Sequence, residues 1–471
     1  MTGDPVLVRG LALAVPVAAV LAATWRGRVR RGLGERDAAA AILATLWNLE
    51  ALIAVNLLAQ DLGWWRFTAV GALYRGVPID LLLGWALLWG AVPGLVARRA
   101  PIPLVAASLG WLDLAVMPLA EPVVVLGEHW LAGEAVAMAV ALLPGLLVAS
   151  WTAGGRRLPL RAAAQIVLAA AGGMALPIVL TGVWRQPTWV LGLMAQALAV
   201  PSLLGLAAVR EFALAGRGTP LPYDPPERLV VTGPYAYVRN PMQAAMTGGY
   251  LLLALLDPVF LAAALVAFAY GAGLAAWHEG EGLTARFGGE WAAYRRAVRA
   301  WVPRWRPVAF PGVVASVYVA TTCGICSQVG GWIVARRPAG LRVLAAEDHP
   351  AGLRRITYES ADGRGAQGVA AIAHVLTHIH LGWALAGWTL MIPGVGRFAQ
   401  LCMDAFGGAP RTLAVRNGPS PAGKPGGYGR PPGRRVTVCR GSGSGRGKVL
   451  PVPAGSTKEI GACLPQERSP D

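Results

Sequence analysis

The sequence predicts a mainly α-helical protein with about nine membrane-spanning helices, followed by a small cytosolic α/β domain and a disordered tail. Three observations predict this fold class. Apolar residues make up 55% of the chain and charged residues only 14%. Apolar segments of about 20 residues, the length needed to cross a hydrocarbon core, recur up to about residue 277. From about residue 308 the apolar runs have the length and spacing of short strands and helices.

The spanning helices follow from the apolar segments in chain order. Seven spans precede a long polar loop, at 5–24, 37–60, 78–97, 101–119, 131–152, 162–183 and 188–209. A helical hairpin is predicted next, at about 243–256 and 258–277, because Asp257-Pro258 between the two arms is a turn signal.

Three acidic residues, Glu50, Asp80 and Asp113, fall within these predicted spans. A charge at the centre of a bilayer costs roughly 2.5–3.5 kcal/mol on insertion scales. We therefore expect each of them near the end of a span or beside a polar partner on a neighbouring helix.

The arginines between the spans predict the orientation. The loops after the odd-numbered spans contain "RGRVRRGLGER", "ARRA" and "GGRRLPLR", whereas the opposite side has only Arg66, Arg75 and Arg185 near its span ends. Cytoplasmic loops of membrane proteins carry the excess of Lys and Arg. We therefore expect a multi-pass protein of the cell membrane with its N-terminus outside. The later polar loops and the C-terminal domain then lie in the cytoplasm.

The net charge of +17 does not indicate a nucleic-acid partner. A Gly/Pro-rich tail at 411–471 holds 11 Lys and Arg against 3 Asp and Glu, and most other basic residues flank apolar segments. Such a tail buries too little apolar surface to become ordered. The cysteines are too few for a disulfide framework and fit a reducing compartment; they are Cys323, Cys326, Cys402, Cys439 and Cys463.

The composition divides the chain into four regions. Residues 1–190 hold membrane helices of unassigned role, 191–307 the hairpin with its polar loops, 312–412 the α/β domain and 413–471 the tail. In the α/β domain, strands are predicted from "VVASVYVA", "LRVLAA" and "LRRITYES". Helices are predicted from "CSQVGGWIVARR", "GVAAIAHVLTHI", "LGWALAGWTLMI" and "VGRFAQLCMDAF".

Two polar segments flank the hairpin. The first is "TGPYAYVRNPMQ" at 232–243 and the second is "WHEGEGLTARFGGEWAAYRRAVRAWVPRW" at 277–305. A hairpin returns its two ends to one membrane face, so side chains of the two segments should meet. They are Arg239 and Asn240 from the first, and Glu279, Glu281, Tyr294 and Arg295 from the second. This suits a polar cofactor beside a lipid-soluble substrate; the alternative is an interfacial belt of Tyr, Trp and Arg.

The two segments together resemble the isoprenylcysteine carboxyl methyltransferase and phospholipid methyltransferase superfamily, over about 80 residues. The resemblance implies that S-adenosylmethionine binds from the cytoplasm and that a lipophilic acceptor enters from the bilayer. It implies catalytic roles for Arg239, Glu279 and Arg295. The cofactor-binding residues it implies are Gly233, Tyr235, Tyr237, Arg239, Asn240, Pro241, Gln243, Glu279 and Glu281.

Two departures keep other functions open. Asn240 stands where the family usually has His, and Gln243 where it usually has Tyr; Glu279 and Glu281 are separated where relatives often pair two adjacent glutamates. Some sterol reductases share a similar arrangement and use a nicotinamide cofactor. Hydride transfer and a non-catalytic membrane scaffold are therefore the alternatives.

A second motif, "TTCGICSQVGGW", places Cys323 and Cys326 between a predicted strand and a predicted helix. The N-terminus of a helix stabilises a thiolate, and this spacing lets the second thiol resolve a mixed disulfide formed on the first. Strand, CxxC and helix form the thioredoxin-like arrangement. The alternatives are inert cysteines or half of a zinc site completed by His374, His378 and His380; we expect no metal.

The stretch around the cysteines also resembles the DCC thiol–disulfide oxidoreductase family, across about 100 residues. The similar parts include "L.RITYESADG", "GVAAIAHVL", "LGWALAGW" and "DAFGGAPR". Ala320-Thr321-Thr322 stands where the family has an Asp before the first Cys. The resemblance implies catalytic Cys323 and Cys326 and a thiol or disulfide partner.

The two resemblances together imply a membrane S-adenosylmethionine-dependent methyltransferase that acts on a membrane lipid or another lipophilic acceptor and is fused to a CxxC thiol–disulfide oxidoreductase. The alternative is a membrane-anchored electron-transfer protein or lipid reductase whose methyltransferase-like region no longer binds S-adenosylmethionine.

Overall fold

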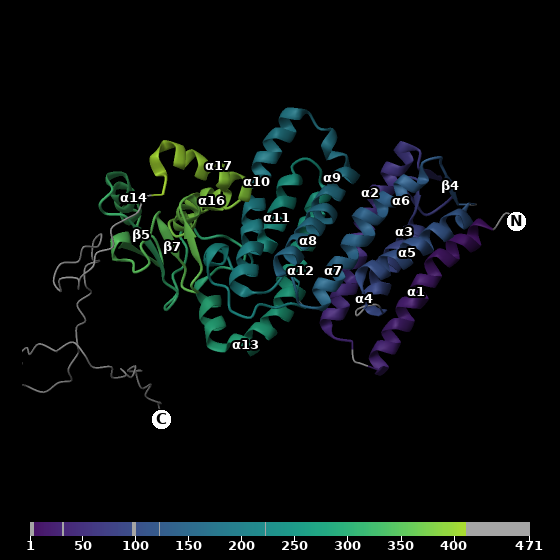
Figure 1. Ribbon diagram of the computed structural model, residues 1–471, viewed down its shortest axis with the longest axis horizontal. Helices are drawn as coiled ribbons and strands as arrows, with labels where there is room; N and C mark the ends of the chain where they lie inside the picture. Colours follow the sequence, from purple (N-terminus) through teal and green to yellow (C-terminus); the bar gives the residue numbers. More distant parts are fainter. Residues whose placement is uncertain (1–3, 31–32, 97–99, 122, 222, 411–471) are drawn as a thin grey trace, which may run out of the picture. The chain divides into compact units, whose positions relative to one another are not determined.

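The computed structural model describes residues 4–30, 33–96, 100–121, 123–221 and 223–410 (Figure 1). The fold is mainly helical, with a small sheet near the C-terminal end of the described chain. The predicted disordered tail, with Cys439 and Cys463, lies outside the described residues.

The N-terminal part is a bundle of long apolar helices. Its members are α1 (Pro5–Arg30), α2 (Glu35–Leu62), α3 (Ile79–Ala86), α4 (Val92–Val96), α5 (Ile102–Val116), α6 (Trp130–Ala137), α7 (Leu143–Ala153), α8 (Leu158–Ala170), α9 (Leu176–Thr181) and α10 (Thr188–Glu211). Some of these join end to end. In the described part of the chain, seven helices are thereby long and apolar enough to cross a membrane. They coincide with the seven predicted spans.

Prolines explain why several spans consist of two named helices. Turns of π-helix at Leu87–Ala91, Met138–Leu142 and Ala171–Ala175 lie just before Pro93, Pro144 and Pro177. A proline inside a helix has no N–H to donate, and its ring clashes with the carbonyl four residues earlier. A wider turn at that point relieves the clash while the helix continues.

Two of the three acidic residues predicted within spans, Asp80 and Asp113, have polar partners. Arg9 Nε donates to Asp80 Oδ2 over 2.7 Å. The indole of Trp85 and the carboxyl group of Glu134 both hydrogen-bond Asp113. The expectation of partners is confirmed for Asp80 and Asp113. The partner Glu134, on another helix, was not predicted.

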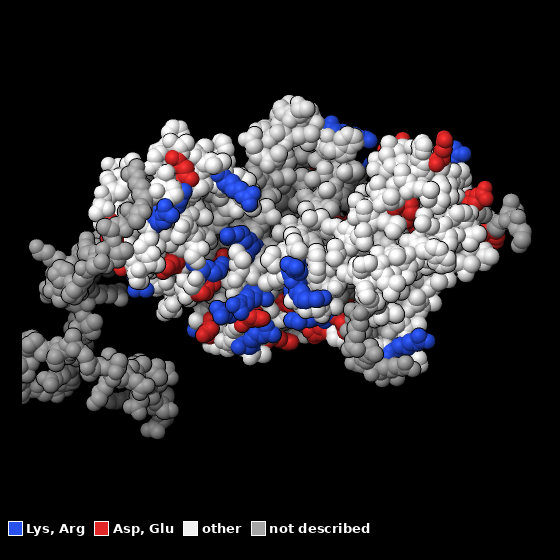
Figure 2. Space-filling view, in the orientation of Figure 1, with Lys and Arg blue, Asp and Glu red and all other residues white. Residues whose placement is uncertain are grey.

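Four short strands at the end of the bundle were also not predicted. Strand β1 (Trp65–Phe67) pairs with β4 (Val124–Leu126), and β2 (Leu73–Tyr74) pairs with β3 (Val77–Pro78), both antiparallel. They join loops between helices. The side of this bundle seen in Figure 2 carries few charged groups, whereas Lys and Arg gather further along, over the loops and helix after the hairpin.

The hairpin consists of α11 (Pro241–Leu253) and α12 (Val259–Tyr270), and α13 (Ala276–Ala297) follows it. Helix α11 has 13 residues, which is short for a span. The stretch Val259–Ala275 is long and apolar enough to count as a span only together with Glu279–Ala297, from which it is bent by 50°. The total of nine spans therefore stays a prediction.

The C-terminal part contains a four-stranded mixed sheet in the order β6-β5-β7-β8. Its strands are β5 (Ala315–Val319), β6 (Leu341–Ala345), β7 (Thr357–Glu359) and β8 (Gly365–Gln367). Strand β5 is parallel to β6 and antiparallel to β7, which is antiparallel to β8. Its helices are α14 (Gly324–Ala335), α15 (Val369–Leu376), α16 (Leu381–Leu390) and α17 (Pro393–Met403). The predicted elements are confirmed; β8 is additional.

The regions predicted as 191–307 and 312–412 share a hydrophobic core, in which α16 lies beside α10 (Figure 1). Tyr237 and Trp388 are buried in it, with ring centroids 6.0 Å apart in an edge-to-face contact. Tyr237 Oη donates to the Thr377 carbonyl over 2.8 Å. Trp305 stacks on His380 at 4.6 Å. These contacts hold the C-terminal part against the loop between α10 and α11, which contains Tyr237 and which we call the polar loop.

Candidate functional site

The two polar segments that flank the hairpin come together through their backbones. The Arg239 N–H donates to Arg299 O over 2.8 Å and the Asn240 N–H to Ala300 O over 3.1 Å. The Arg239 guanidinium donates to Arg295 O over 3.2 Å. The expected meeting of Arg239 and Asn240 with the end of the second segment is therefore observed. We call the group of Tyr235, Arg239, Asn240, Glu279, Glu281, Trp291, Tyr294 and Arg295 the loop–hairpin site.

An aromatic cluster occupies the middle of the loop–hairpin site. Tyr235 and Tyr294 are buried, and Tyr294 Oη donates to the Tyr235 carbonyl over 3.0 Å. Burial raises the pKa of Tyr235 well above its ordinary value, and the charges of Tyr294, Glu279 and Glu211 add to the rise. The Tyr235 hydroxyl therefore stays protonated and can donate.

Two donors in this cluster have no acceptor. Tyr235 Oη and Trp291 Nε1 are buried, and neither has a hydrogen-bond partner in the described part of the chain. An unmade hydrogen bond on a buried donor costs about 1–3 kcal/mol. Orphaned donors of this kind often mark the place of a bound molecule or water.

The charged residues of the loop–hairpin site include both signs. Burial lowers the pKa of Arg239, and the neighbouring Arg295 lowers it further. Two cations close together favour an anion between or beside them. Glu279 and Glu281 are exposed carboxylates in the first turns of α13. A zwitterion could thus find both of its opposite charges here.

The remaining residues predicted to bind a cofactor lie elsewhere on the loop. Asn240 and Pro241 begin α11. Gln243 faces Gly271 across the hairpin. Gly233 and Tyr237 face the C-terminal part, where Tyr237 is occupied by Thr377. From the predicted set, the structure therefore brings Tyr235, Arg239, Asn240 and Arg295 to the junction of the two segments, with Glu279 and Glu281 on the first turns of α13 and Trp291 added.

A second candidate site is a cavity of about 390 Å³ between the polar loop and the C-terminal part. Its walls come from α10, from residues 231–236, from the linker at 307–313 and from the sheet, α15 and α16 of the C-terminal part. We call it the inter-module cavity. The sequence did not predict it, because its walls lie up to about 180 residues apart in the chain.

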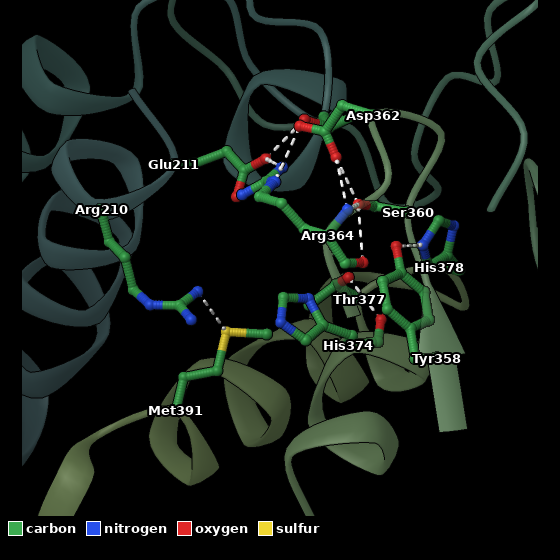
Figure 3. Close-up of polar contacts among 11 residues, drawn as sticks. Arg210, Glu211, Tyr358, Ser360, Asp362, Arg364, His374, Thr377, His378 and Met391 are labelled. Carbon is green, nitrogen blue, oxygen red and sulfur yellow. Dashed lines mark hydrogen bonds and ion pairs between the residues drawn. The ribbon is translucent and has the colours of Figure 1, made fainter. Parts of the chain in front are cut away.

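One arginine of this cavity is fully neutralised (Figure 3). Arg364 Nη2 lies 3.0 Å from Glu211 Oε1, and Arg364 Nε lies 2.7 Å from Asp362 Oδ2. Thr232 Oγ1 donates to the same Glu211 oxygen over 2.6 Å. This network joins α10, the polar loop and the β7–β8 turn, so it also holds the two parts of the chain together.

Two histidines and a tyrosine form another wall. Tyr358 Oη lies 3.0 Å from His378 Nε2, and His378 Nδ1 lies 2.7 Å from the Ala339 carbonyl. The Tyr358 ring stacks on His374 at 4.8 Å. Burial lowers the pKa of His374 to about 4, with a further contribution from Arg210. His374 is therefore neutral at pH 7.

Arg210 differs from Arg364. Its Nη1 points to the thioether of Met391, with Nη1 and Sδ 3.3 Å apart (Figure 3). No carboxylate forms an ion pair with Arg210 among the described residues. A thioether is a weak acceptor, so this guanidinium keeps most of its donors for something else.

The cysteine pair forms a third candidate site. Cys323 caps the N-terminus of α14 and Cys326 lies in its first turn; both are half-buried. Ile325 between them is 71% exposed. The buried Glu347 carboxylate accepts hydrogen bonds from the Thr321 and Thr322 N–H groups and from the Thr322 hydroxyl. Glu347 therefore fixes the loop that leads into the cysteines.

The histidines do not join the cysteines in a metal site. No group of three or more His, Cys, Asp or Glu residues that could hold a metal ion occurs within the described ranges. His378 is bonded to Tyr358 and Ala339, and His380 stacks on Trp305. The possibility of a zinc half-site thus finds no support in these side chains.

Comparisons with known proteins add no relative. No family model matches the chain, and neither curated proteins nor solved structures include one that is similar to it. The function is therefore argued from the sites themselves.

Proposed function

We propose that the chain is a multi-pass membrane enzyme that transfers a methyl group from S-adenosylmethionine to a lipophilic acceptor. The observation that carries the proposal is the loop–hairpin site, where two segments separated by a hairpin meet around two orphaned donors. Its place beside apolar helices suits an acceptor that dissolves in the bilayer. The arginine-rich loops favour an orientation with this site in the cytoplasm.

The side chains present fit S-adenosylmethionine, which carries a carboxylate, an ammonium group and a base with several acceptor nitrogens. Arg239, helped by Arg295, would hold the carboxylate. Glu279 or Glu281 would hold the ammonium group or the ribose hydroxyls. The orphaned Tyr235 Oη and Trp291 Nε1 offer donors to the base.

When bound, the cofactor supplies a methyl group that its sulfonium already activates. The protein then needs to provide orientation and a dry environment. Tyr294 and Trp291 in the buried cluster exclude water from one side of the site. Asn240 can form hydrogen bonds but cannot become a cation, so no step is assigned to a protonated side chain at this position.

Calorimetric titration of the detergent-purified protein with S-adenosylmethionine tests this proposal. We expect binding near one equivalent and its loss in Arg239→Ala and in Glu279→Ala. Matched controls are Arg296→Ala and Glu290→Ala, exposed residues on the same helix, which should bind as the wild type does. Equal affinity in all variants would remove the loop–hairpin site from cofactor binding.

We propose a second function, thiol–disulfide exchange, for the C-terminal part. It is favoured by the position of Cys323 and Cys326 at the start of α14, directly after β5 of a sheet ordered β6-β5-β7-β8. A βαβ unit followed by an antiparallel pair and a helix supports a thioredoxin-like fold. The helix N-terminus favours the thiolate of Cys323.

The Cys323 thiolate attacks one sulfur of a partner disulfide and forms a mixed disulfide, and the other partner sulfur leaves as a thiolate that takes up a proton. Cys326 loses its proton and attacks Cys323, which releases the second partner thiol. The partner is reduced by two electrons and the Cys323–Cys326 pair is oxidised to a disulfide.

Thiol counting in the full chain tests this function. In a background with Cys402, Cys439 and Cys463 replaced by Ser, we expect two titratable thiols after mild reduction and none after glutathione disulfide. Cys326→Ser should instead accumulate a mixed disulfide with glutathione. An unchanged thiol count between the two treatments would contradict the proposal.

The alternative, a membrane-anchored electron-transfer protein or lipid reductase, is favoured by Asn240 and Gln243. The titration with S-adenosylmethionine and the thiol count together distinguish this alternative from the methyltransferase. Thiol exchange without any binding of S-adenosylmethionine, in a folded sample, would support the alternative.

A further inference from the structure

We propose that the inter-module cavity binds a small amphipathic anion, with a carboxylate or phosphate group held by Arg210 and an apolar body held between the polar loop and the C-terminal part. This ligand is distinct from the methyl donor and from the disulfide partner. The assignment rests on the charges, the lining and the position of the cavity.

The two arginines of the cavity are paired differently. Arg364 is matched by Glu211 and Asp362 at 3.0 and 2.7 Å. Among the described residues, Arg210 forms no ion pair with a carboxylate, and its Nη1 lies 3.3 Å from the Met391 thioether. A guanidinium at the wall of a partly desolvated cavity strongly favours the binding of an anion that accepts hydrogen bonds from two of its N–H groups. The two arginines and two carboxylates balance in charge, but both carboxylates pair with Arg364, so the donors of Arg210 stay available to an anion.

Apolar side chains form a large part of the remaining lining and suit a hydrocarbon body. Leu214, Pro234, Phe310 and Trp388 come from four different segments and enclose the space beside Arg210. The volume of about 390 Å³ lies within the range of small-molecule sites, about 300–1,000 Å³. A purely inorganic anion would leave most of this apolar surface uncovered.

His374 adds specificity without charge. Its ring lies against Tyr358 and lines the cavity. It is neutral at pH 7 because burial lowers its pKa to about 4. Neutral imidazole can donate one hydrogen bond and accept another. A ligand with an anionic group and a neighbouring hydroxyl or amide would use both Arg210 and His374.

The position of Arg210 allows two sources for the ligand. Arg210 lies at the end of α10, a helix long and apolar enough to cross a membrane. A lipid headgroup and a soluble metabolite both offer an anion next to an apolar body. Because both parts of the chain line the cavity, either ligand should stabilise their contact by mass action.

The first experiment uses hexyl phosphate as a soluble probe with protein in phosphatidylcholine nanodiscs. Calorimetry and thermal unfolding are recorded for the wild type, Arg210→Gln and the matched control Arg217→Gln, whose side chain is 61% exposed and pairs with Glu227. We expect binding and a higher unfolding temperature in wild type and control, and at least tenfold weaker binding in Arg210→Gln. Ala207→Leu, which fills the cavity and keeps Arg210, should also weaken binding.

The second experiment replaces the lipid with phosphatidylglycerol and omits the probe. A rise in unfolding temperature that Arg210→Gln abolishes identifies a lipid headgroup as the ligand, and a response to hexyl phosphate alone identifies a soluble one. If neither ligand acts through Arg210, the proposal is wrong. It is also wrong if S-adenosylmethionine displaces hexyl phosphate. Loss of cofactor binding in Arg239→Ala concerns the loop–hairpin site only, so the two proposals fail separately.

Discussion

The C-terminal part and the loop–hairpin site differ in how completely their buried polar groups are hydrogen-bonded. In the C-terminal part, no buried side-chain nitrogen or oxygen lacks a partner within the described residues 312–410. Glu347 accepts from Thr321 and Thr322, and His378 is bonded on both ring nitrogens. In the loop–hairpin site, Tyr235 Oη and Trp291 Nε1 are buried without an acceptor.

This difference distinguishes buried polar groups that stabilise the fold from buried donors that are available to a ligand. A satisfied buried network stabilises one structure by itself. Buried donors without acceptors cost free energy unless another molecule supplies the acceptors. The C-terminal part thus satisfies its own buried polar groups, whereas a ligand can satisfy the two buried donors of the loop–hairpin site. The following predictions test this contrast, from the largest expected effect to the smallest.

The largest effect is expected for Trp388, which fills the core shared by the two parts. Trp388→Ala should lower the free energy of unfolding by about 3–5 kcal/mol, because it leaves a large cavity against Tyr237. Urea-dependent pulse proteolysis in detergent measures this. The control Trp189→Ala removes a tryptophan that is 68% exposed. An equal loss in both variants would mean that the shared core does not stabilise the protein.

The next effect concerns pH and His374. Its pKa falls from 6.5 to about 4 on folding because of burial and then Arg210, while Arg364 and His378 lower it and Glu211 raises it. The unfolded chain binds the proton first, so this contribution is fully present above pH 6.5 and is lost as the pH falls towards 4. At about 1.4 kcal/mol per pKa unit, the loss reaches about 3 kcal/mol.

His374→Phe should therefore flatten the fall of stability between pH 6.5 and 4. Unfolding curves at half-unit pH steps check this, with His349→Phe as a control, since His349 contacts Glu359 outside the cavity, with Nε2 and Oε1 3.2 Å apart. A slope that does not change in His374→Phe would contradict the burial of a neutral imidazole.

Glu347 should show a smaller cost. Glu347→Gln places an amide where three donors need an acceptor, so we expect a loss of about 1–3 kcal/mol. Burial alone would raise the pKa of Glu347, but the hydrogen bonds from Thr322 and Thr321 outweigh it and lower the pKa. The stabilisation is therefore present above pH 4.5 and lost below it. Glu359→Gln, on a residue whose side chain is 40% exposed, is the matched control.

The smallest effects compare two tyrosines of one loop. Tyr237→Phe removes a hydrogen bond to Thr377 and should cost about 1 kcal/mol. Tyr235→Phe removes a hydroxyl without a partner, so it should cost nothing in the absence of a ligand. Tyr235→Phe should nevertheless weaken binding of S-adenosylmethionine, whereas Tyr237→Phe should not. The reverse pattern would break the contrast between the two regions.

Sequence patterns predicted much of the fold. Seven apolar segments give seven long helices, because hydropathy alone determines which segments can cross a bilayer. The hairpin brings Arg239 to Arg295 as expected, since antiparallel helices return their ends to one face. Strand β8 escaped prediction because Gly365–Gln367 contains no β-branched or aromatic residue.

The sites were harder to predict than the elements. Tyr237 looked like a cofactor residue, but its hydroxyl is used by Thr377, which lies 140 residues later in the sequence. Neither Arg210 nor Arg364 lies in a sequence motif, and only the packing of the C-terminal part against the rest of the chain brings them to one cavity. Contacts between residues far apart in the sequence leave no periodic pattern in it. This part of the site can therefore be identified only from the structure.

The most direct test of the central claim is methyl transfer itself. Membranes that contain the wild-type protein would be incubated with S-adenosylmethionine labelled in its methyl group, and the organic extract would be counted. We predict label in lipophilic material with the wild type and with Cys323→Ser, and none above background with Arg239→Ala or Glu279→Ala. Label that persists unchanged in both loop–hairpin variants, or no label with a folded wild-type protein, would contradict the account.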